Sequence, residues 1–559
     1  MSIYFDDQKQ NDRVSQLHEK EEEDLARILA QKYGIPFIDL KTAQIKTNAL
    51  RLLPEERAKA SKIATFDIVG KKLRVAILSP RREETKNEIK DLEKRGYFVE
   101  VFVASIHGLQ YAWERYKDIT NSTKTNSGSL DVSSDEISTT LQRVKSINDV
   151  RIILDEVIGA NNKFKVSSIV EIILAGGIGV GASDIHFEPE DESVTVRYRL
   201  DGVLTIVANL NHPTYKLLLS RVKLLSGMKL NIKSDAQDGR FTVDINKQEI
   251  EMRISVIPGG NGESIVMRIL NPDNIDVEIE TMGIPKYLLE VITREAGRPN
   301  GLILNTGPTG SGKTTTLYSL LGKKKGPGIK IITIEDPVEY HLKGIVQTQV
   351  DHKKNYTFAS GLRAAMRQDP DVIMVGEIRD VETAEIAIHS ALTGHLVFST
   401  LHTNSAAGAF PRLIDLGIEP TILSSAVNLV LAQRLVRKLC NHCKQPIAIP
   451  EGRRKMIERI FSQTPKNDIP SIPSTIYTAQ GCEECNKSGY KGRIGIFEGI
   501  KTTEAIAEIL ESHPTSRLIK KTAREQGTMS LQEDGINKLL KGITSIDELD
   551  RVIDIESDE

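Results

Sequence analysis

Cysteine and tryptophan are scarce in this chain, and long apolar runs are absent. Only four cysteines and one tryptophan occur among its 559 residues, and aromatic residues make up 5%. Four cysteines are too few for a disulfide scaffold, so in a reducing compartment they are expected to be thiols or metal ligands. So few aromatic side chains offer little for a base-stacking platform that binds single-stranded nucleic acid. Without an uninterrupted apolar run of about 18 residues, the sequence predicts no membrane span.

The chain also lacks a charge excess of either sign. Its 74 Lys and Arg residues nearly cancel its 76 Asp and Glu residues, which leaves a formal charge of −2. A generic polyanion binder normally has a basic excess, so direct nucleic-acid binding is not expected. The first residues, MSIYFDDQKQND, are polar and acidic and contain no apolar core of a secretory signal. A cytoplasmic protein of roughly three to five domains is therefore predicted.

Hydrophobic patterning outlines two domains before the middle of the chain. EEEDLARILAQKYG is typical of a helix that ends near Gly34, whereas KKLRVAILS and YFVEVFVAS alternate as strands do. These elements predict a small α/β domain. Thr120–Thr140 is rich in Ser, Thr, Asn and Gly, which predicts a linker. Beyond it, SVTVRYRLDGVLTIVANL predicts two strands around an Asp-Gly turn.

A Gly-rich segment follows an apolar strand pattern near residue 300. GLILNTGPTGSGKTTTLYSLL contains G-x-x-x-x-G-K-T at Gly307–Thr314, between a predicted strand and a predicted helix. Glycines let backbone N–H groups converge on phosphate oxygens, and the helix directs its positive end toward them. Lys313 would supply charge for the β- and γ-phosphates, and Thr314 would offer a hydroxyl to Mg²⁺. A chance Gly-rich turn is the alternative.

Two further apolar runs end in acids. DVIMVGEIRD leads to Glu377, and IKIITIEDPVEY leads to Glu335, Asp336 and Glu339. Buried parallel strands have this pattern, and their carboxyl ends meet at the ligand crevice. A glutamate placed there can orient or deprotonate water, although a solvated loop end is the alternative.

A third apolar run, HLVFSTLHTNSA, is flanked by His395 and His402. Either imidazole could sense a γ-phosphate by hydrogen bonding from the end of a strand. A satisfied polar side chain with no such function is the alternative for each.

All four cysteines form two C-x-x-C pairs, Cys440/Cys443 and Cys482/Cys485. Each pair places two thiols on one tight turn, and two such turns complete a tetrahedral S₄ site. Zinc is the expected metal because this geometry suits it and it has no redox chemistry. The basic neighbours Arg437, Lys438, Lys444 and Lys487 are expected to favour thiolates. Disulfides or a redox pair are the alternatives.

Four motifs occur in a fixed order: GPTGSGKTT, TIEDPVEY, DPDVIMVGEIRD and GHLVFSTLHTNSA. Together they closely resemble the Walker A motif, Asp box, Walker B motif and His box of the type II secretion and type IV pilus assembly ATPases. The resemblance extends upstream to SDIHFEPED, VRYRLDG, QDGRF and IVMRIL, and downstream to LAQRLVRKLC and both cysteine pairs.

The resemblance implies roles for individual residues. Glu339 and Glu377 would be the acids of hydrolysis with Lys313, and His402 would sense the nucleotide. Arg240 and Arg253, with Arg268 as a further candidate, would reach the nucleotide of an adjoining subunit, where an arginine finger is worth on the order of 10³–10⁵ in rate. A fold-stabilising role is the alternative for each arginine. The residues expected to contact the nucleotide are Gly307, Pro308, Thr309, Gly310, Ser311, Gly312, Lys313, Thr314, Thr315, Glu335, Asp336 and His402.

The resemblance also implies a fold class: a multidomain α/β chain with a RecA-like P-loop NTPase domain. The expected segments are an N-terminal α/β domain (1–120), a flexible linker (121–147), a second, PAS-like domain (148–275), the RecA-like domain (276–435), a zinc-binding module (436–500) and a C-terminal helical region (501–559).

The function implied is that of a hexameric motor ATPase that powers pilus assembly or pseudopilus extension from the cytoplasmic face of the inner membrane. ATP, Mg²⁺ and Zn²⁺ are the expected cofactors. An inner-membrane platform protein or membrane adaptor would bind the N-terminal domain. A nucleic-acid motor on the same core, such as a conjugative DNA-transfer ATPase, is the alternative function, and an inactive scaffold is a third.

Overall fold

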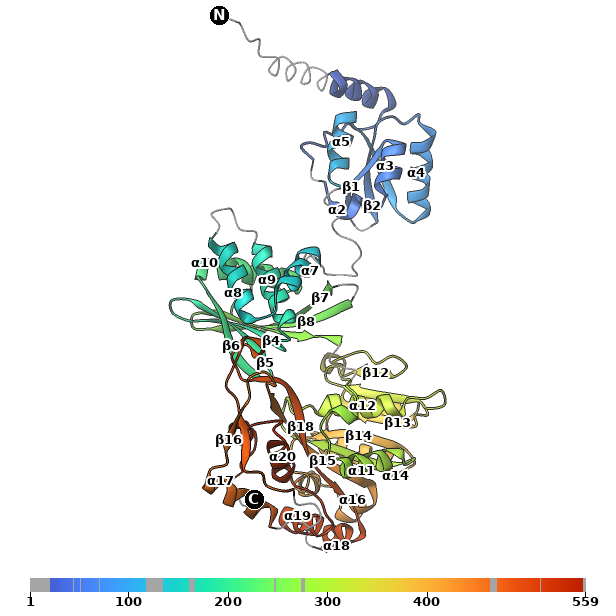
Figure 1. The fold of residues 1–559 in the computed structure, drawn as a ribbon. Coiled ribbons are helices and arrows are strands. Elements are labelled where there is room, and N and C mark those ends of the chain that lie inside the picture. Colours follow the sequence, from blue (N-terminus) through green and yellow to red (C-terminus); the bar gives the residue numbers. More distant parts are fainter. Residues whose placement is uncertain are drawn as a thin grey trace, which may run out of the picture. The chain divides into compact units, whose positions relative to one another are not determined.

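The computed structural model describes residues 21–43, 45–50, 52–69, 71–116, 134–159, 166–245, 248–272, 277–462, 470–512 and 514–555. The chain divides into two compact units, Met1–Asp131 and Val132–Glu559, and Figure 1 shows the fold of each. Among the helices in the described ranges, none combines the length and the apolar character needed to cross a bilayer.

The first unit is the small α/β domain that the sequence predicts. A helix over residues 21–33 ends just before Gly34. Strand β1 (Ile63–Val69) pairs antiparallel with β2 (Lys72–Ile77), which pairs parallel with β3 (Phe98–Val103). The described residues of this unit also form the helices α2 (Thr47–Leu50), α3 (Glu55–Ser61), α4 (Glu83–Lys94) and α5 (Ile106–Glu114).

The second unit begins with a helix inside the range predicted as a linker. Residues 117–133 lie outside the described residues, but α7 (Ser134–Arg143) is helical. Its Ile137 is fully buried, and its main helical neighbour is α9 (Val166–Gly179). The burial of an apolar side chain therefore prevails over a composition rich in Ser and Thr.

A six-stranded antiparallel sheet forms the first layer of this unit. The strand order is β6-β5-β4-β9-β8-β7. The predicted Asp-Gly hairpin is confirmed, because Asp201 and Gly202 both have positive φ (48° and 87°), as a two-residue turn of type I′ requires. The strands are β4 (Asp184–Pro189), β5 (Val194–Leu200), β6 (Val203–Leu210), β7 (Gln237–Ile245), β8 (Gln248–Gly259) and β9 (Gly262–Leu270).

Helices cover one face of that sheet and leave the other to polar residues. Helices α8 (Ile147–Gly159), α9 and α10 (His212–Leu225) share an apolar core with the inward side chains of the strands, among them Phe187 and Tyr198. The strands alternate, so residues such as Arg253 and Arg268 lie on the opposite face.

The second layer is a seven-stranded sheet of order β12-β11-β13-β14-β10-β15-β18. All neighbouring strands are parallel except the last pair. The strands are β10 (Gly301–Thr306), β11 (Ile331–Glu335), β12 (Val346–Gln349), β13 (Val372–Val375), β14 (Leu396–Leu401), β15 (Val427–Leu439) and β18 (Tyr490–Lys501).

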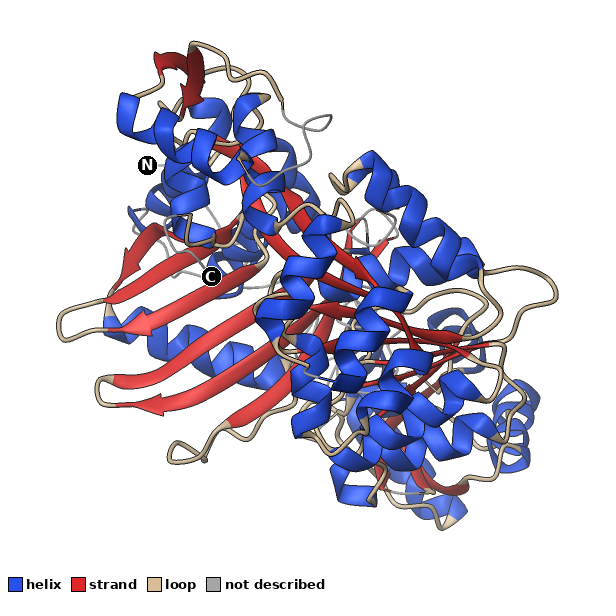
Figure 2. Cartoon of the chain, turned by 90° about the horizontal axis from the view of Figure 1, so that it is seen from below, coloured by secondary structure: helices blue, strands red, loops and turns tan. Residues whose placement is uncertain are grey.

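Helices cover both faces of this sheet, which explains why its strands are apolar without alternation. One core contains Ile303 and packs against α11 (Lys286–Gly297) and α12 (Lys313–Lys324). The other contains Leu304 and packs against helices on the opposite face. Figure 2 shows helices packed along the strands. The helices of the second core that precede β15 are α13 (Phe358–Met366), α14 (Val381–Leu392), α15 (Ala409–Asp415) and α16 (Pro420–Ala426).

The cysteine module is inserted between two strands of the main sheet. Strands β15 and β18 pair from Leu429↔Lys501 to Leu439↔Tyr490, so the predicted boundary at residue 435 falls inside β15. The module contains β16 (Gln445–Ala448), α17 (Glu451–Phe461) and β17 (Thr475–Thr478). The C-terminal region is helical as predicted, with α18 (Glu504–Ser512), α19 (Ser516–Glu525), α20 (Leu531–Leu540) and α21 (Ile546–Val552).

Candidate functional site

The carboxyl ends of four parallel strands meet at one edge of the seven-stranded sheet. The register places Thr306 of β10 beside Leu401 of β14. It also places Val375 of β13 between Ser399 of β14 and Ile334 of β11. The segments that follow these strands therefore share one edge, where open parallel sheets bind their ligands. His402 lies at this edge. His395 lies at the opposite end of β14, where its Nδ1 is 3.1 Å from the Ser390 carbonyl oxygen.

The Gly307–Lys313 segment forms a loop that admits no other residue at its first position. Gly307 has a φ of 148°, and an added Cβ would lie 2.6 Å from the Gln433 carbonyl oxygen and 2.7 Å from Ser311 Oγ. Lys313 begins α12 and donates from Nζ to the Gly307 oxygen (2.8 Å) and the Pro308 oxygen (3.1 Å). Burial lowers the pKa of Lys313, against an opposing effect of Glu377. The Lys313 ammonium is thus held at the loop, where the negative charge of a phosphate would offset the free-energy cost of burying it.

The same loop contains a buried donor that suits a phosphate. In the described part of the chain, Ser311 Oγ is a buried polar atom without a hydrogen-bond partner. Such an atom costs about 1–3 kcal/mol unless a ligand satisfies it. Thr314, half-buried one residue after Lys313, is the side chain that would hold Mg²⁺. The residues therefore fit a magnesium-bound nucleotide, in which the cation neutralises charge on the β- and γ-phosphates.

Glu377 follows β13 and lies between two basic side chains. Its Oε1 is 2.5 Å from Arg379 Nη2, and its Oε2 is 3.2 Å from His402 Nε2. Burial acts to raise the pKa of Glu377, but Arg379 and His402 outweigh it, so the net pKa is lowered. Glu377 is therefore ionised at neutral pH, as a proton acceptor must be.

Glu339 occupies a different environment. It is half-buried beyond the end of β11, and burial raises its pKa against the opposing charges of Arg268 and Arg253. The backbone is held there as well, since Arg253 Nη2 donates to the Val338 carbonyl oxygen. Two acids with pKa values shifted in opposite directions thus lie at the same edge of the sheet.

The arginines near Glu339 belong to a row across the six-stranded sheet. Arg240, Arg253, Arg268, Asp184 and Arg199 are successive register partners on strands β7, β8, β9, β4 and β5. Asp184 is buried and bonds both neighbours, with Oδ1 3.0 Å from Arg268 Nε and Oδ2 3.3 Å from Arg199 Nε. The structure thus brings Arg253 and Arg268 to Glu339 of the same chain. Arg240 is exposed on the edge strand β7.

The other acids of the TIEDPVEY motif differ from Glu339. Glu335 is buried, and its carboxylate accepts from Tyr318, from Thr333 Oγ1 (2.5 Å) and from Gln347 Nε2 (3.1 Å). Asp336 is exposed, 3.8 Å from His352 Nε2. The carboxylate of Glu335 is therefore engaged in hydrogen bonds within the fold, whereas the side chain of Asp336 is accessible to solvent.

Gln433 contacts both the strand before the loop and the helix after it, a role that the sequence patterns did not predict. Its Oε1 accepts from Asn305 Nδ2 (2.9 Å) and Thr316 Oγ1 (2.8 Å), which ties β15 to β10 and α12. An added Cβ on Gly312 would lie 2.8 Å from Gln433 Nε2. The available signal was a polar residue inside the apolar run LVLAQRLV.

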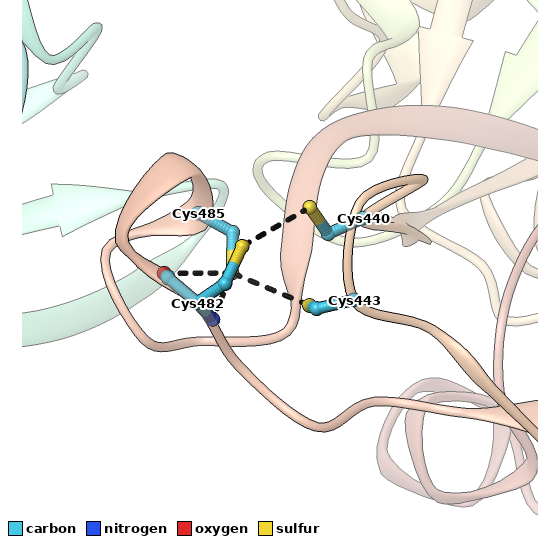
Figure 3. Close-up of side chains that lie close together, drawn as sticks. All are labelled: Cys440, Cys443, Cys482 and Cys485. Atoms are coloured by element: carbon cyan, nitrogen blue, oxygen red, sulfur yellow. Dashed lines mark hydrogen bonds between the residues drawn. The ribbon is translucent and has the colours of Figure 1, made fainter.

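The four cysteines come together as predicted (Figure 3). Three of the distances between their sulfur atoms are 3.9 Å (Cys440–Cys482), 3.8 Å (Cys443–Cys485) and 3.7 Å (Cys482–Cys485). Four thiolates about 2.3 Å from a central zinc would lie about 3.8 Å apart, so the donor set fits a tetrahedral zinc ion.

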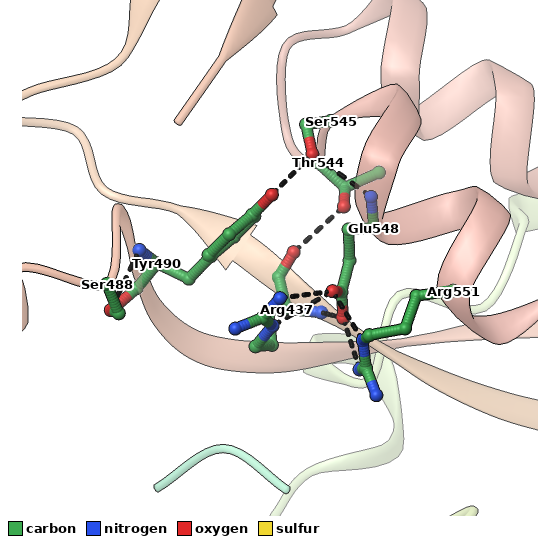
Figure 4. A network of polar contacts seen from close by, with 7 residues as sticks. All are labelled: Arg437, Ser488, Tyr490, Thr544, Ser545, Glu548 and Arg551. Atoms are coloured by element: carbon green, nitrogen blue, oxygen red, sulfur yellow. Dashed lines mark hydrogen bonds and ion pairs between the residues drawn. The ribbon is translucent and has the colours of Figure 1, made fainter. Parts of the chain in front are cut away.

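One of the four basic neighbours of the cysteines, Arg437, does not act as expected. Arg437 instead bonds the buried Glu548 through Nε (2.9 Å) and Nη2 (2.7 Å), and its guanidinium lies 4.0 Å from the centre of the Tyr490 ring (Figure 4). Burial acts to raise the pKa of Cys485, but the backbone N–H groups of Cys482 and Gly489 outweigh it and lower that pKa to about 7. Burial raises the pKa of Cys443 and of Cys482, so the lowering is confined to Cys485 among these three thiols.

Two family models match the chain. The model described as "Type II/IV secretion system protein" matches residues 160–551, and the model of the MshEN domain matches residues 33–122. The first covers more than half of the chain and includes the P-loop, both acids, His402 and all four cysteines.

Individual proteins are similar over most of their length. The type II secretion system protein E of Pseudomonas aeruginosa is 43% identical over 69% of this chain and 74% of its own length. The type IV pilus assembly ATPase PilB of Myxococcus xanthus is 36% identical over 95% of this chain and 91% of its own length. The X-ray structure of the Yersinia pseudotuberculosis ATPase DotB is similar in fold, with a TM-score of 0.51, 19% identity, and coverage of 70% of this chain and 96% of that one.

Proposed function

Because this chain belongs to the type II/IV secretion system protein family, we propose that it hydrolyses ATP to power type IV pilus assembly or extension of a type II secretion pseudopilus. The observation that carries the proposal is the shared sheet edge at which Lys313, Glu377 and His402 meet. A relative similar over nearly its whole length, PilB of Myxococcus xanthus, is named a type IV pilus assembly ATPase.

The geometry supports a separate role in hydrolysis for each of these groups. The Gly307–Thr314 loop holds the phosphates, with Lys313 released from the loop carbonyls toward the β- and γ-oxygens. Glu377 accepts a proton from the attacking water, for which its lowered pKa suits it at neutral pH. His402 Nε2 lies 3.2 Å from Glu377 Oε2. Through this contact, the protonation state of Glu377 influences the position of the loop that contains His402. Arg253 and Arg268, which lie near Glu339, neutralise negative charge that develops in the transition state.

We also propose that the working form is a hexamer at the cytoplasmic face of the inner membrane. Motion of the six-stranded sheet against the seven-stranded sheet during turnover would provide the mechanical stroke. Arg240 is the arginine best placed to serve an adjoining copy, since it is exposed on an edge strand. The first unit, which the MshEN model matches, would bind a membrane-anchored platform protein or adaptor.

A zinc ion held by Cys440, Cys443, Cys482 and Cys485 completes the proposal. The ion would have a structural role, because four thiolates leave no open coordination position for chemistry. The ion would fix the turn that follows β15 and the turn that precedes β18. These two paired strands extend from the turns to the nucleotide site.

Subunit exchange tests whether Arg240 acts on an adjoining copy. Mixing Arg240→Ala with Lys313→Ala protein is expected to restore activity that neither variant has alone, because some interfaces combine an intact loop with an intact arginine. In a random equimolar closed ring, roughly a quarter of the interfaces would do so. Thr242→Ala, which changes an exposed residue on the same face of β7, should keep full activity. No recovery on mixing, together with ATPase activity per mole that is independent of protein concentration, would show that Arg240 does not act in trans.

A further inference from the structure

The loop that follows β14 carries His402, yet the contact between His402 and Glu377 cannot position that loop alone. The side chain of His402 is 51% exposed, and its Nε2 lies 3.2 Å from Glu377. An exposed imidazole with one such contact has several accessible rotamers, and fixing them costs free energy. The backbone of residues 403–406 must therefore be held by other groups if His402 is to keep its distance from Glu377.

One such group is Arg434 of β15. Its Nη2 donates to the Asn404 carbonyl oxygen at 2.8 Å, and its Nη1 donates to the Gln433 carbonyl oxygen at 3.0 Å. The same Nη1 lies 3.0 Å from the position that a Cβ on Gly307 would take. Arg434 thus lies between the P-loop and the His402 loop and bonds the backbone of the latter.

The second group is Glu498 of β18. Its Oε1 accepts a hydrogen bond of 3.0 Å from the backbone N–H of Ala406, in a buried environment. Burial raises the pKa of Glu498 against the opposing backbone N–H of Ala406. A buried carboxylate is costly in free energy, and here it satisfies a backbone donor that would otherwise be unpaired.

Arg434 and Glu498 come from neighbouring positions of one strand ladder. Glu498 is the register partner of Ala432, two residues before Arg434, and Ala432 is in turn the partner of Thr306 at the start of the P-loop. One ladder therefore holds both ends of the Asn404–Ala406 segment: Arg434 donates to the Asn404 carbonyl oxygen, and Glu498 accepts from the Ala406 N–H.

We propose that Arg434 and Glu498 clamp the loop Thr403–Ala406 and are positioning residues for ATP hydrolysis, which set the place of His402 beside Glu377. This inference rests on the proposed function, and it assigns the β15–β18 ladder a part in turnover. Small displacements of catalytic groups are expensive, since misplacement by about 1 Å can cost on the order of 10²-fold in rate.

A double-mutant cycle on kcat tests the clamp. Arg434→Ala and Glu498→Ala are each expected to lower kcat about tenfold or more, with a change in KM for ATP below about threefold. In a His402→Ala background the same substitutions should have little further effect, because the group they position is gone. Glu498→Gln keeps an acceptor oxygen and should retain most of the wild-type rate.

Arg454→Ala is the matched control. Arg454 Nη2 donates to the Pro473 carbonyl oxygen at 2.8 Å, the same kind of bond as that of Arg434, but it lies on α17 in the cysteine module. Hydrogen exchange adds a readout independent of turnover: the Ala406 amide should exchange at least about tenfold faster in Glu498→Ala, but not in Arg454→Ala.

Three results would overturn the clamp. These are an unchanged kcat in both alanine variants, losses that remain as large in the His402→Ala background, and an unaltered exchange rate of Ala406 in Glu498→Ala. The second would mean that Arg434 or Glu498 acts without His402. None of these results would affect the proposed function, which is tested separately by ATP hydrolysis and fibre assembly in the wild-type protein and in Lys313→Ala.

Discussion

Replacing Glu377 by glutamine is expected to lower kcat for ATP hydrolysis by about 10²–10⁴-fold while nucleotide still binds. The glutamine keeps the size of the side chain and an oxygen that can face His402 Nε2, now 3.2 Å away. It loses the negative charge, and with it the ability to accept a proton from water. Steady-state rates and the affinity for a fluorescent ATP analogue, measured on the same preparation, separate the two effects.

Two further variants sharpen this prediction. Glu382→Gln changes an exposed acid on α14 that pairs with Arg363, and it should leave kcat unchanged. Glu339→Gln should be less severe than Glu377→Gln, because its raised pKa makes it the weaker candidate for the ionised base. If Glu377→Gln turns over ATP at the wild-type rate, the assignment of the base is wrong.

Loss of one cysteine is the second large effect. Cys482→Ser is expected to reduce bound zinc from about one ion per chain to nearly none. It should also lower the free energy of unfolding of the module by roughly 3–10 kcal/mol, since metal binding there contributes directly to folding. Metal analysis of protein purified under reducing conditions and a thermal melt measure the two quantities.

His442→Ala is the control for that experiment. His442 lies between Cys440 and Cys443 in sequence, is exposed, and is a residue type that binds zinc elsewhere. The S₄ geometry predicts that its loss leaves both the zinc content and the melting temperature unchanged. A full complement of zinc in Cys482→Ser, or the loss of zinc in His442→Ala, would contradict the assigned ligand set.

The sequence predicted those parts of the site that depend on short segments. The strand before Gly307 and the helix after it follow from local patterning, and apolar runs that end in Glu335 and Glu377 indicate strands of a buried parallel sheet. The gathering of the four cysteines at one site was predictable because the chain contains no other cysteine.

The rest depends on contacts between segments far apart in the chain. Arg437 pairs with Glu548, 111 residues away, and no local pattern distinguishes that arrangement from a role beside the thiolates. Likewise, Glu498 reaches Ala406 across 92 residues, and Gln433 reaches Asn305 across 128. The row of arginines depends on the register of five strands, and a one-residue slip would move each of them to the other face.

The most direct test of whether ATP hydrolysis powers fibre assembly uses the Lys313→Ala variant. Its Mg²⁺-dependent ATP hydrolysis is compared with that of the wild-type protein, and fibre assembly is measured in cells that carry each form. If ATP hydrolysis at this loop powers fibre assembly, the variant will fold, lose hydrolysis by at least about 10²-fold, and assemble no fibres. Hydrolysis and fibre growth at the wild-type level in that variant would contradict this claim.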